Sequence, residues 1–150
     1  MKKTIKLFSL AALSMLALSF TSCKSDDPDE TRFYDQLPTP AQTFISNYFP
    51  GIKTTTITYD KKDKEYEVYL TNGYEITFSN VGEWIDVDAP AGQTVPTGIA
   101  PATIENYVFE KYPGDGINEI EKVKVGYDVE LVSGLDLLFN SSGNVIGINN

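Results

Sequence analysis

Hydrophobic and polar side chains alternate along residues 66–78, apart from a break at residues 71–73 that reads Thr-Asn-Gly. Alternation with a period of two is typical of a β-strand with one buried face, and a break that contains glycine predicts a turn. A three-residue loop would place Val68 opposite Ile76 and keep the hydrophobic side chains on one face, whereas a two-residue loop would mix the faces. The stretch is therefore predicted to be a β-hairpin with a three-residue loop.

The same pattern returns 61 residues later, over residues 127–145. Identical residues recur at six matched positions, namely Tyr66/Tyr127, Val68/Val129, Leu70/Leu131, Gly73/Gly134, Phe78/Phe139 and Gly82/Gly143. The second hairpin should accordingly pair Val129 with Leu137. An ungapped match of this length indicates that one structural unit is written twice in the chain.

A helix is predicted before each hairpin. In the first copy, residues 37–48 place Phe44 and Ile45 on one face at helical spacing, with Thr39 as the N-cap and Gln42 able to close a capping box. A Phe-Pro-Gly sequence ends this helix. The second copy repeats the arrangement, with a proline at the start and Tyr-Pro-Gly at the end.

The predicted elements add up to an α+β fold. Further strands are expected over residues 54–59 and 120–125 and after the glycine turn that follows each hairpin. Each repeat is then a helix plus a four-stranded antiparallel sheet, over residues 37–88 and 99–150, joined by a linker over residues 89–98 that is rich in Pro, Gly and Ala. Because a unit of about 50 residues is near the lower limit for an independent core, the two repeats are expected to form one domain.

The start of the chain predicts export. Residues 1–22 combine a basic beginning with a short apolar run, as in a signal peptide; the alternative is a buried helix, which the basic start disfavours. The Phe-Thr-Ser-Cys sequence that ends at Cys23 resembles the lipobox of bacterial lipoproteins. This resemblance implies that Cys23 becomes the acylated first residue, whereas the alternative is a free or paired cysteine.

The segment after the cysteine is predicted to be a tether. Residues 23–36 are polar and acidic without a hydrophobic pattern, which indicates disorder. Short acidic runs at this place also resemble the signal that sends some lipoproteins to the outer surface of Gram-negative cells; a solvated linker is the alternative. We therefore expect an exported protein, lipid-anchored in the outer membrane, on either its periplasmic or its cell-surface side.

Composition excludes several classes of function. Asp and Glu total 21 against 12 Lys and Arg, for a net charge of −9, which argues against nucleic-acid binding. The chain has no His and one Cys, so it holds neither a Ser-His or Cys-His catalytic pair nor a His metal ligand. We expect a protein that is not an enzyme and that uses no cofactor or metal. An enzyme that uses two carboxylates on an envelope polymer is the remaining catalytic alternative.

Two motifs carry a resemblance to a known family. The sequences FPG…YEVYLTNGYEITF and YPG…YDVELVSGLDLLF resemble the PepSY-like family, whose domains are likened to the beta-lactamase inhibitor protein, a tandem repeat of a helix plus an antiparallel sheet. The resemblance covers roughly residues 37–150. It implies an envelope or secreted binding module, with inhibition of a hydrolase as one role, and it carries over no inhibitor residues.

The outward face of the predicted sheet is the candidate binding surface. The alternation places there Glu67, Tyr69, Glu75, Thr77, Trp84 and Asp86 in the first copy, and Asp128, Glu130, Asp136, Leu138 and Val145 in the second. Glu75 should lie beside Asp86, and Glu130 opposite Asp136. Because like charges across strands are destabilising, such a surface indicates a basic peptide or a cation as partner, with Tyr69 and Trp84 as aromatic anchors.

Other interpretations of this surface stay open. Acidic residues on one face of an antiparallel sheet also serve solubility, and the alternative for Trp84 is that the linker covers it. Calcium is a further option, although no D-x-D-x-D-G loop is present. The leading hypothesis is a non-enzymatic envelope module that binds a polypeptide, a hydrolase or a basic peptide, through the sheet; a carrier of a small ligand or cation is the alternative.

Overall fold

A computed structural model describes residues 30–149 of the protein. These residues form two α-helices, a short 3-10 helix and nine strands in the order β1(Glu30–Thr31), η1(Tyr34–Gln36), α1(Thr39–Tyr48), β2(Thr54–Asp60), β3(Glu65–Leu70), β4(Glu75–Ser79), β5(Trp84–Asp88), α2(Ala102–Lys111), β6(Ile117–Val123), β7(Gly126–Leu131), β8(Asp136–Asn140) and β9(Val145–Asn149). The predicted α+β class is confirmed.

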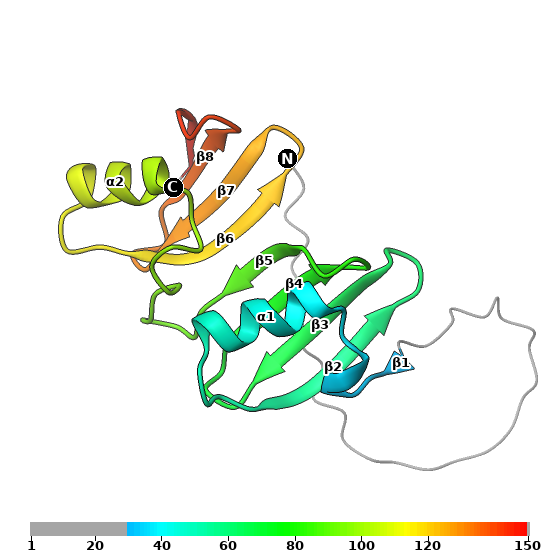
Figure 1. Cartoon of the computed structure of the whole chain (residues 1–150). Coiled ribbons are helices and arrows are strands. Elements are labelled where there is room, and N and C mark those ends of the chain that lie inside the picture. The colour runs from blue at the N-terminus through cyan, green and yellow to red at the C-terminus, as the bar shows by residue number, and fades with distance from the viewer. Residues whose placement is uncertain (1–29, 150) are drawn as a thin grey trace, which may run out of the picture.

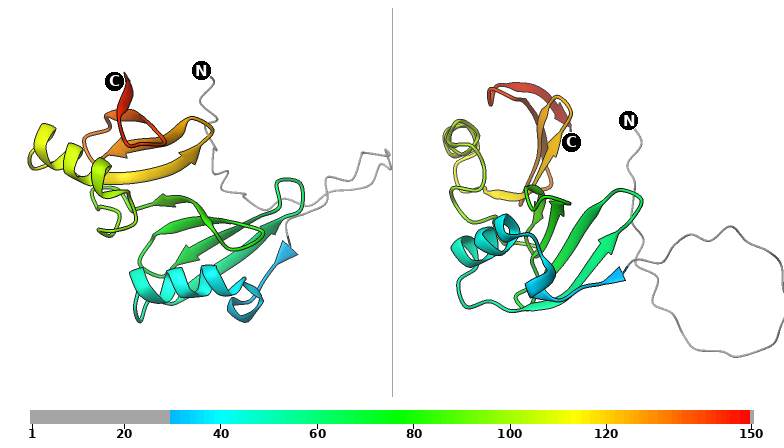
Figure 2. Two further views of the ribbon diagram at one scale, coloured as in Figure 1. Left: turned by 45° about the horizontal axis from the view of Figure 1, so that its top comes forward. Right: turned by 45° about the vertical axis from the view of Figure 1, so that its right-hand side comes forward.

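All nine strands belong to one antiparallel sheet, and each strand pairs with its neighbours in the sequence. The sheet is continuous because β5 of the first half pairs with β6 of the second (Figure 1). Both helices lie on the same side of this sheet, which leaves its other face open (Figure 2). We call the side without helices the open face.

The hairpin registers agree with the prediction. Val68 pairs with Ile76 in the first hairpin and Val129 pairs with Leu137 in the second. The backbone of Leu70 donates a hydrogen bond to Tyr74, which closes the three-residue loop, and Gly73 has the left-handed φ of 90° that this loop requires.

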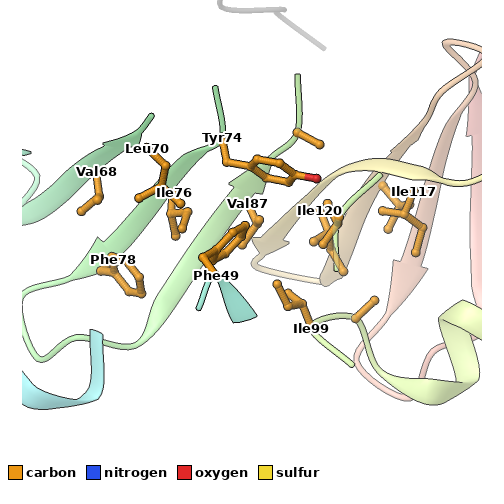
Figure 3. Packing of buried hydrophobic residues seen from close by; sticks show 14 of the residues in the cluster. Phe49, Val68, Leu70, Tyr74, Ile76, Phe78, Val87, Ile99, Ile117 and Ile120 are labelled. Atoms are coloured by element: carbon orange, nitrogen blue, oxygen red, sulfur yellow. The ribbon is translucent and has the colours of Figure 1, made fainter. Parts of the chain in front are cut away.

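One apolar row runs across the sheet on the helix side. Its members follow one another through the ladders from β2 to β9: Ile57, Val68, Ile76, Val87, Ile120, Val129, Leu137 and Ile148. All but Ile148 are at most 3% exposed, and Figure 3 shows the central part of the row. Because the row crosses from β5 to β6 without interruption, the two halves share one core.

Each helix covers the row with aromatic side chains at matched places. Phe44 of α1 meets Phe78 edge to face at 5.5 Å between ring centroids, and Tyr107 of α2 meets Phe139 in the same way at 5.5 Å. Such perpendicular contacts suit the charge distribution of aromatic rings. The sequence repeat is thus also a repeat of core packing.

Three local predictions are wrong. The N-cap of α1 is Pro38 rather than Thr39, and the side chain of Gln42 donates to the carbonyl of Leu37 at 2.8 Å instead of closing a capping box. Part of the expected disordered tether is structured, because residues 30–36 contain β1 and η1. The strand expected over residues 120–125 begins earlier, at Ile117, and ends at Val123.

Candidate functional site

The open face of the sheet carries two rows of carboxylates. The first carboxylate row follows directly paired residues through five strands: Glu75, Asp88, Glu119, Glu130 and Asp136. The second carboxylate row lies beside it on three strands: Asp86, Glu121 and Asp128. Both rows cross the junction of β5 and β6, so the surface belongs to both halves of the protein.

The first row continues onto β3 through Tyr69, which pairs with Glu75. The hydroxyl of Tyr69 lies 3.5 Å from Oε2 of Glu67, at the limit of hydrogen bonding. Burial, followed by the nearby Glu75 carboxylate, raises the pKa of Tyr69 well above its ordinary value. The phenol therefore stays protonated and can donate a hydrogen bond to a carboxylate or to a bound partner.

The carboxylates at the junction are the most perturbed. Burial, and after it the charges of Glu119 and Glu121, raises the pKa of Asp86 to about 8. Burial and the charge of Asp88 likewise raise the pKa of Glu119 to about 7. The atom Oδ1 of Asp86 is buried and meets no hydrogen-bond donor within residues 30–149. A positively charged partner placed here would therefore reduce the repulsion between these carboxylates, and it could also donate a hydrogen bond to Oδ1 of Asp86.

Nine of the eleven predicted surface residues lie on the open face: Glu67, Tyr69, Glu75, Thr77, Asp86, Asp128, Glu130, Asp136 and Leu138. Register places Glu75, Glu130 and Asp136 in the first carboxylate row, and Asp86 in the second. Glu67 pairs with Thr77, which in turn pairs with Asp86, so Glu67 extends the second row onto β3. Glu130 does lie opposite Asp136, whereas the direct partner of Glu75 is Asp88 rather than Asp86.

Trp84 does not lie on the open face, and neither does Val145. A β-bulge makes Trp84 the partner of Phe78, so its side chain turns to the helix side, where it lies 6.4 Å from Phe44 between ring centroids. The equivalent bulge makes Val145 the partner of Phe139. One extra residue in each strand reverses the alternation on which the prediction depended. Tyr69 and Trp84 therefore cannot anchor the same partner.

Sequence reasoning missed the centre of the site. The predicted first repeat ends at Asp88, and the predicted surface includes neither Glu119 nor Glu121. These three residues join the surface only because β5 pairs with β6, through Asp86 with Glu121 and Asp88 with Glu119. The 61-residue repeat favours this junction, since strands that follow one another in the sequence tend to be neighbours in a sheet, but it does not fix which residues pair.

The carboxylates of the open face do not gather around one point. Among residues 30–149, no group of three or more acidic or cysteine side chains converges on a point where it could ligate a metal ion. The carboxylates are spread along rows with strands about 4.8 Å apart rather than gathered in a cleft. Cys23, the predicted lipidation site, lies outside the described residues. Within the described part, neither helix has the length and apolar character needed to cross a bilayer.

These features define the class of the protein: a tandem α+β repeat whose single sheet is covered by helices on one face and is acidic on the other. The family model "Putative beta-lactamase-inhibitor-like, PepSY-like" matches residues 30–68 and 64–147. The chain belongs to this family.

Solved structures of similar chains come from Bacteroides. A protein of Bacteroides vulgatus ATCC 8482, described as a "putative periplasmic protein", is 36% identical with a TM-score of 0.77, covering 84% of this chain and 100% of its own. A "putative calcium-regulated periplasmic protein" of Bacteroides thetaiotaomicron is 35% identical with a TM-score of 0.77 and the same coverage.

A second Bacteroides vulgatus protein, described as a "putative periplasmic protein of unknown function", is 28% identical with a TM-score of 0.75, covering 82% of this chain and 100% of its own. A comparison with curated proteins gives no match. The similar structures support an exported or periplasmic location, in agreement with the coarser part of the sequence prediction.

Proposed function

We propose that the protein is a non-enzymatic, lipid-anchored module of the cell envelope that binds a basic polypeptide on its two carboxylate rows. The observation that carries this proposal is the direct pairing of Asp88 with Glu119, and of Glu119 with Glu130, across consecutive strands. Like charges in direct register destabilise a sheet, so their persistence over five strands needs a compensating role. A cationic partner supplies that role.

Charge and shape both support a polypeptide as the partner. The rows run across the strands, so lysine or arginine side chains along one extended segment can reach successive carboxylates. Tyr69 lies at the end of the first row and offers a hydroxyl and an aromatic ring at the same surface. Hydrogen bonds from cationic side chains to carboxylates are shorter and stronger than neutral ones, which favours this surface for a basic segment.

The test compares two variants of equal net charge. The row variant carries Asp88→Asn, Glu119→Gln and Glu130→Gln, and the control carries Asp35→Asn, Asp63→Asn and Glu110→Gln, which are exposed residues outside the rows. Calorimetry with a decalysine peptide should show at least about tenfold weaker binding for the row variant, since each tenfold step is about 1.4 kcal/mol. Equal affinity in the two variants would mean that net charge alone attracts the peptide, and would refute the site.

The description of the family as beta-lactamase-inhibitor-like supports a hydrolase as the protein that carries such a segment. An affinity capture from envelope and secreted proteins of the native host, with wild-type protein and the row variant as baits, tests this. Recovery of a hydrolase by the wild type and not by the row variant supports inhibition. A hydrolase recovered equally by both baits would place inhibition elsewhere on the protein.

Calcium is the second candidate partner, favoured by the Bacteroides thetaiotaomicron relative that is described as calcium-regulated. Carboxylates are suitable calcium ligands, and Oδ1 of Asp86 has no hydrogen-bond donor in the described chain. If calcium binds at the junction, it should raise the melting temperature more than magnesium at the same ionic strength, and Asp86→Asn should abolish the difference. Identical shifts with both ions would exclude a calcium site.

Lipid anchoring rests on the resemblance of the segment ending at Cys23 to a lipobox. Acylation would hold the wild-type protein in the membrane fraction of the native host, and Cys23→Ser should release it into the soluble periplasmic fraction. Metabolic labelling with a palmitate analogue provides the direct readout, because the label should disappear in the variant. Labelling that persists without Cys23 would contradict the assignment.

A further inference from the structure

A groove lies on the helix side of the sheet, where the two halves meet, on the face opposite the carboxylate rows. It has a volume of about 420 Å³ and is lined by Trp84, Lys122 and Tyr127 of the sheet, Glu105 of α2, and the residues that lead into α2. This volume falls in the range of small-molecule sites, which commonly form between structural units. None of the carboxylates of the two rows lines this groove.

The floor of the groove is aromatic. The ring of Trp84 lies 6.4 Å from that of Tyr127, between centroids, with 31° between the ring planes, and Phe44 lies at the same distance on the other side. Trp84 and Tyr127 are half-buried and retain exposed area toward the groove. Such a floor favours a flat apolar ring, which gains from stacking as well as from burial.

The charge that faces this floor is positive. Nζ of Lys122 lies 3.9 Å from the centroid of the Trp84 ring. Loss of solvent lowers the pKa of this ammonium group, opposed by the charge of Glu83. The other charged group of the groove is already engaged, because Oε1 of Glu105 accepts a hydrogen bond from the backbone of Gly98 at 2.6 Å.

The rim of the groove is fixed to both helices. Gly98 is held by Glu105 of α2, and its carbonyl accepts a hydrogen bond from the hydroxyl of Tyr48 of α1 at 2.9 Å. The adjoining Ile99 is 5% exposed and packs in the shared core. The groove is therefore formed in the protein as it stands, and little ordering is needed when a ligand enters.

We propose that this groove binds a carboxylate carried on a flat apolar ring, with the ring on Trp84 and Tyr127 and the carboxylate on Lys122. Lys122 lies over the indole in the free protein, and its flexible side chain moves aside to meet the carboxylate. The exchange is favourable because a charge-assisted hydrogen bond is stronger than a cation–π contact at a partly exposed site. The proposal is independent of the polypeptide site on the open face.

The chain contains its own reporter, since Trp84 is its one tryptophan. Titration of the purified protein with phenylacetate should change the tryptophan fluorescence and saturate. Binding should be at least about tenfold tighter than that of the neutral 2-phenylethanol or the cationic 2-phenylethylamine, a difference of about 1.4 kcal/mol. A response without saturation, or equal responses to the three compounds, would overturn the proposal.

Two lysine variants make the test specific. Lys122→Gln removes the cation from the groove and should weaken phenylacetate binding at least about tenfold, to the level of 2-phenylethanol. Lys124→Gln lies in the turn just after β6, outside the groove lining, and should leave binding unchanged. Unchanged binding in the folded Lys122→Gln variant, checked by circular dichroism, would also overturn the proposal.

The source of the carboxylate is decided by a further pair of probes. N-acetylphenylalanine has the free carboxylate of a polypeptide C-terminus, and N-acetylphenylalanine amide lacks it. Tighter binding of N-acetylphenylalanine than of phenylacetate would assign the groove to polypeptide C-termini. Tighter binding of phenylacetate would assign it to free ring carboxylates, and preference for the amide would contradict the role of Lys122.

Discussion

Asp88 lies directly opposite Glu119 in the ladder that joins the two halves of the sheet. That ladder has three paired positions, and a second of them sets Asp86 against Glu121. Only the middle pair, Val87 with Ile120, is apolar, and it faces the helices. The junction is thus stabilised on one face by the shared core and destabilised on the other by like charges.

The stability of the protein should fall as the pH rises from about 4 to about 8. The pKa of Asp86 is about 8 in the folded protein against an ordinary value of 3.8, so in this window the folded state holds a proton that the unfolded chain releases. For each such proton, the unfolding free energy falls by about 1.4 kcal/mol for every unit by which the pH rises. The stabilisation is fully present below pH 4 and is lost as the pH passes 8.

Asp86→Asn tests this relationship because it removes the titrating group with little change in shape. Its melting temperature should exceed that of the wild type at pH 8 and approach it at pH 5, and Glu119→Gln should act in the same direction over a narrower window. Parallel pH profiles for Asp86→Asn and the wild type would show that Asp86 titrates normally.

The glycine turn after the first hairpin should tolerate no side chain. Gly82 has a φ of 86°, and an added Cβ would lie 2.8 Å from Cβ of Pro38 and 2.9 Å from the backbone nitrogen of Ala41. Gly134 has a similar φ of 83° with nothing within 4 Å of an added Cβ, so it is a matched control. Gly134→Ala should cost about 1 kcal/mol for the left-handed backbone, and Gly82→Ala about 1–3 kcal/mol more for the overlap. Urea denaturation measures both, and equal costs would contradict the contact with the start of α1.

Equivalent positions in the two repeats should differ in their tolerance to truncation. Val87 on β5 is fully buried, whereas its counterpart Ile148 on β9 is 54% exposed because β9 is the last strand of the described sheet. Val87→Ala should cost about 2 kcal/mol through lost burial and a cavity. Ile148→Ala removes more atoms and should nevertheless cost less than about 1 kcal/mol. A larger loss for Ile148→Ala in chemical denaturation would mean that β9 is covered in solution.

The segment between β5 and α2 should depend on one side chain. Nδ2 of Asn118 donates to the carbonyl oxygens of Ala89 at 3.1 Å, Pro90 at 3.3 Å and Gln93 at 2.9 Å. Asn118→Ala should lower the unfolding free energy by about 1 kcal/mol, since it removes the donor from three carbonyl oxygens in partly buried and exposed hydrogen bonds. Hydrogen exchange should show faster exchange of the segment's backbone amides, and Asn118→Asp should not restore protection because a carboxylate cannot donate.

The sequence predicted the hairpins because their pattern is local. Alternation along residues 66–78, together with a loop that ends in Gly73, determines the register once one face must be buried. The bulge at Trp84 could not be predicted from the sequence. An extra residue in a strand is not visible when either face could accept the side chains around it. Continuing the alternation through Ile85 placed Trp84 on the wrong face.

The centre of the acidic surface could not be predicted for a different reason. No turn links β5 to β6, since a long segment and α2 lie between them, so no loop length fixes their register. The pairing of Asp88 with Glu119 is a tertiary result of the apolar row, which requires Val87 to meet Ile120. Sequence patterns predict the strands of each half, whereas packing between the halves determines which carboxylates lie together at the junction.

The strand order also bears on how the protein folds. Every strand from β2 onward pairs with the strand before it in the sequence. During synthesis from the N-terminus, the partner of each new strand is therefore already present. Contacts that are close in sequence favour fast folding. The first half can therefore present β5 as a template before α2 and β6 are available, and the like-charged junction forms only once the second half has begun to build its own core.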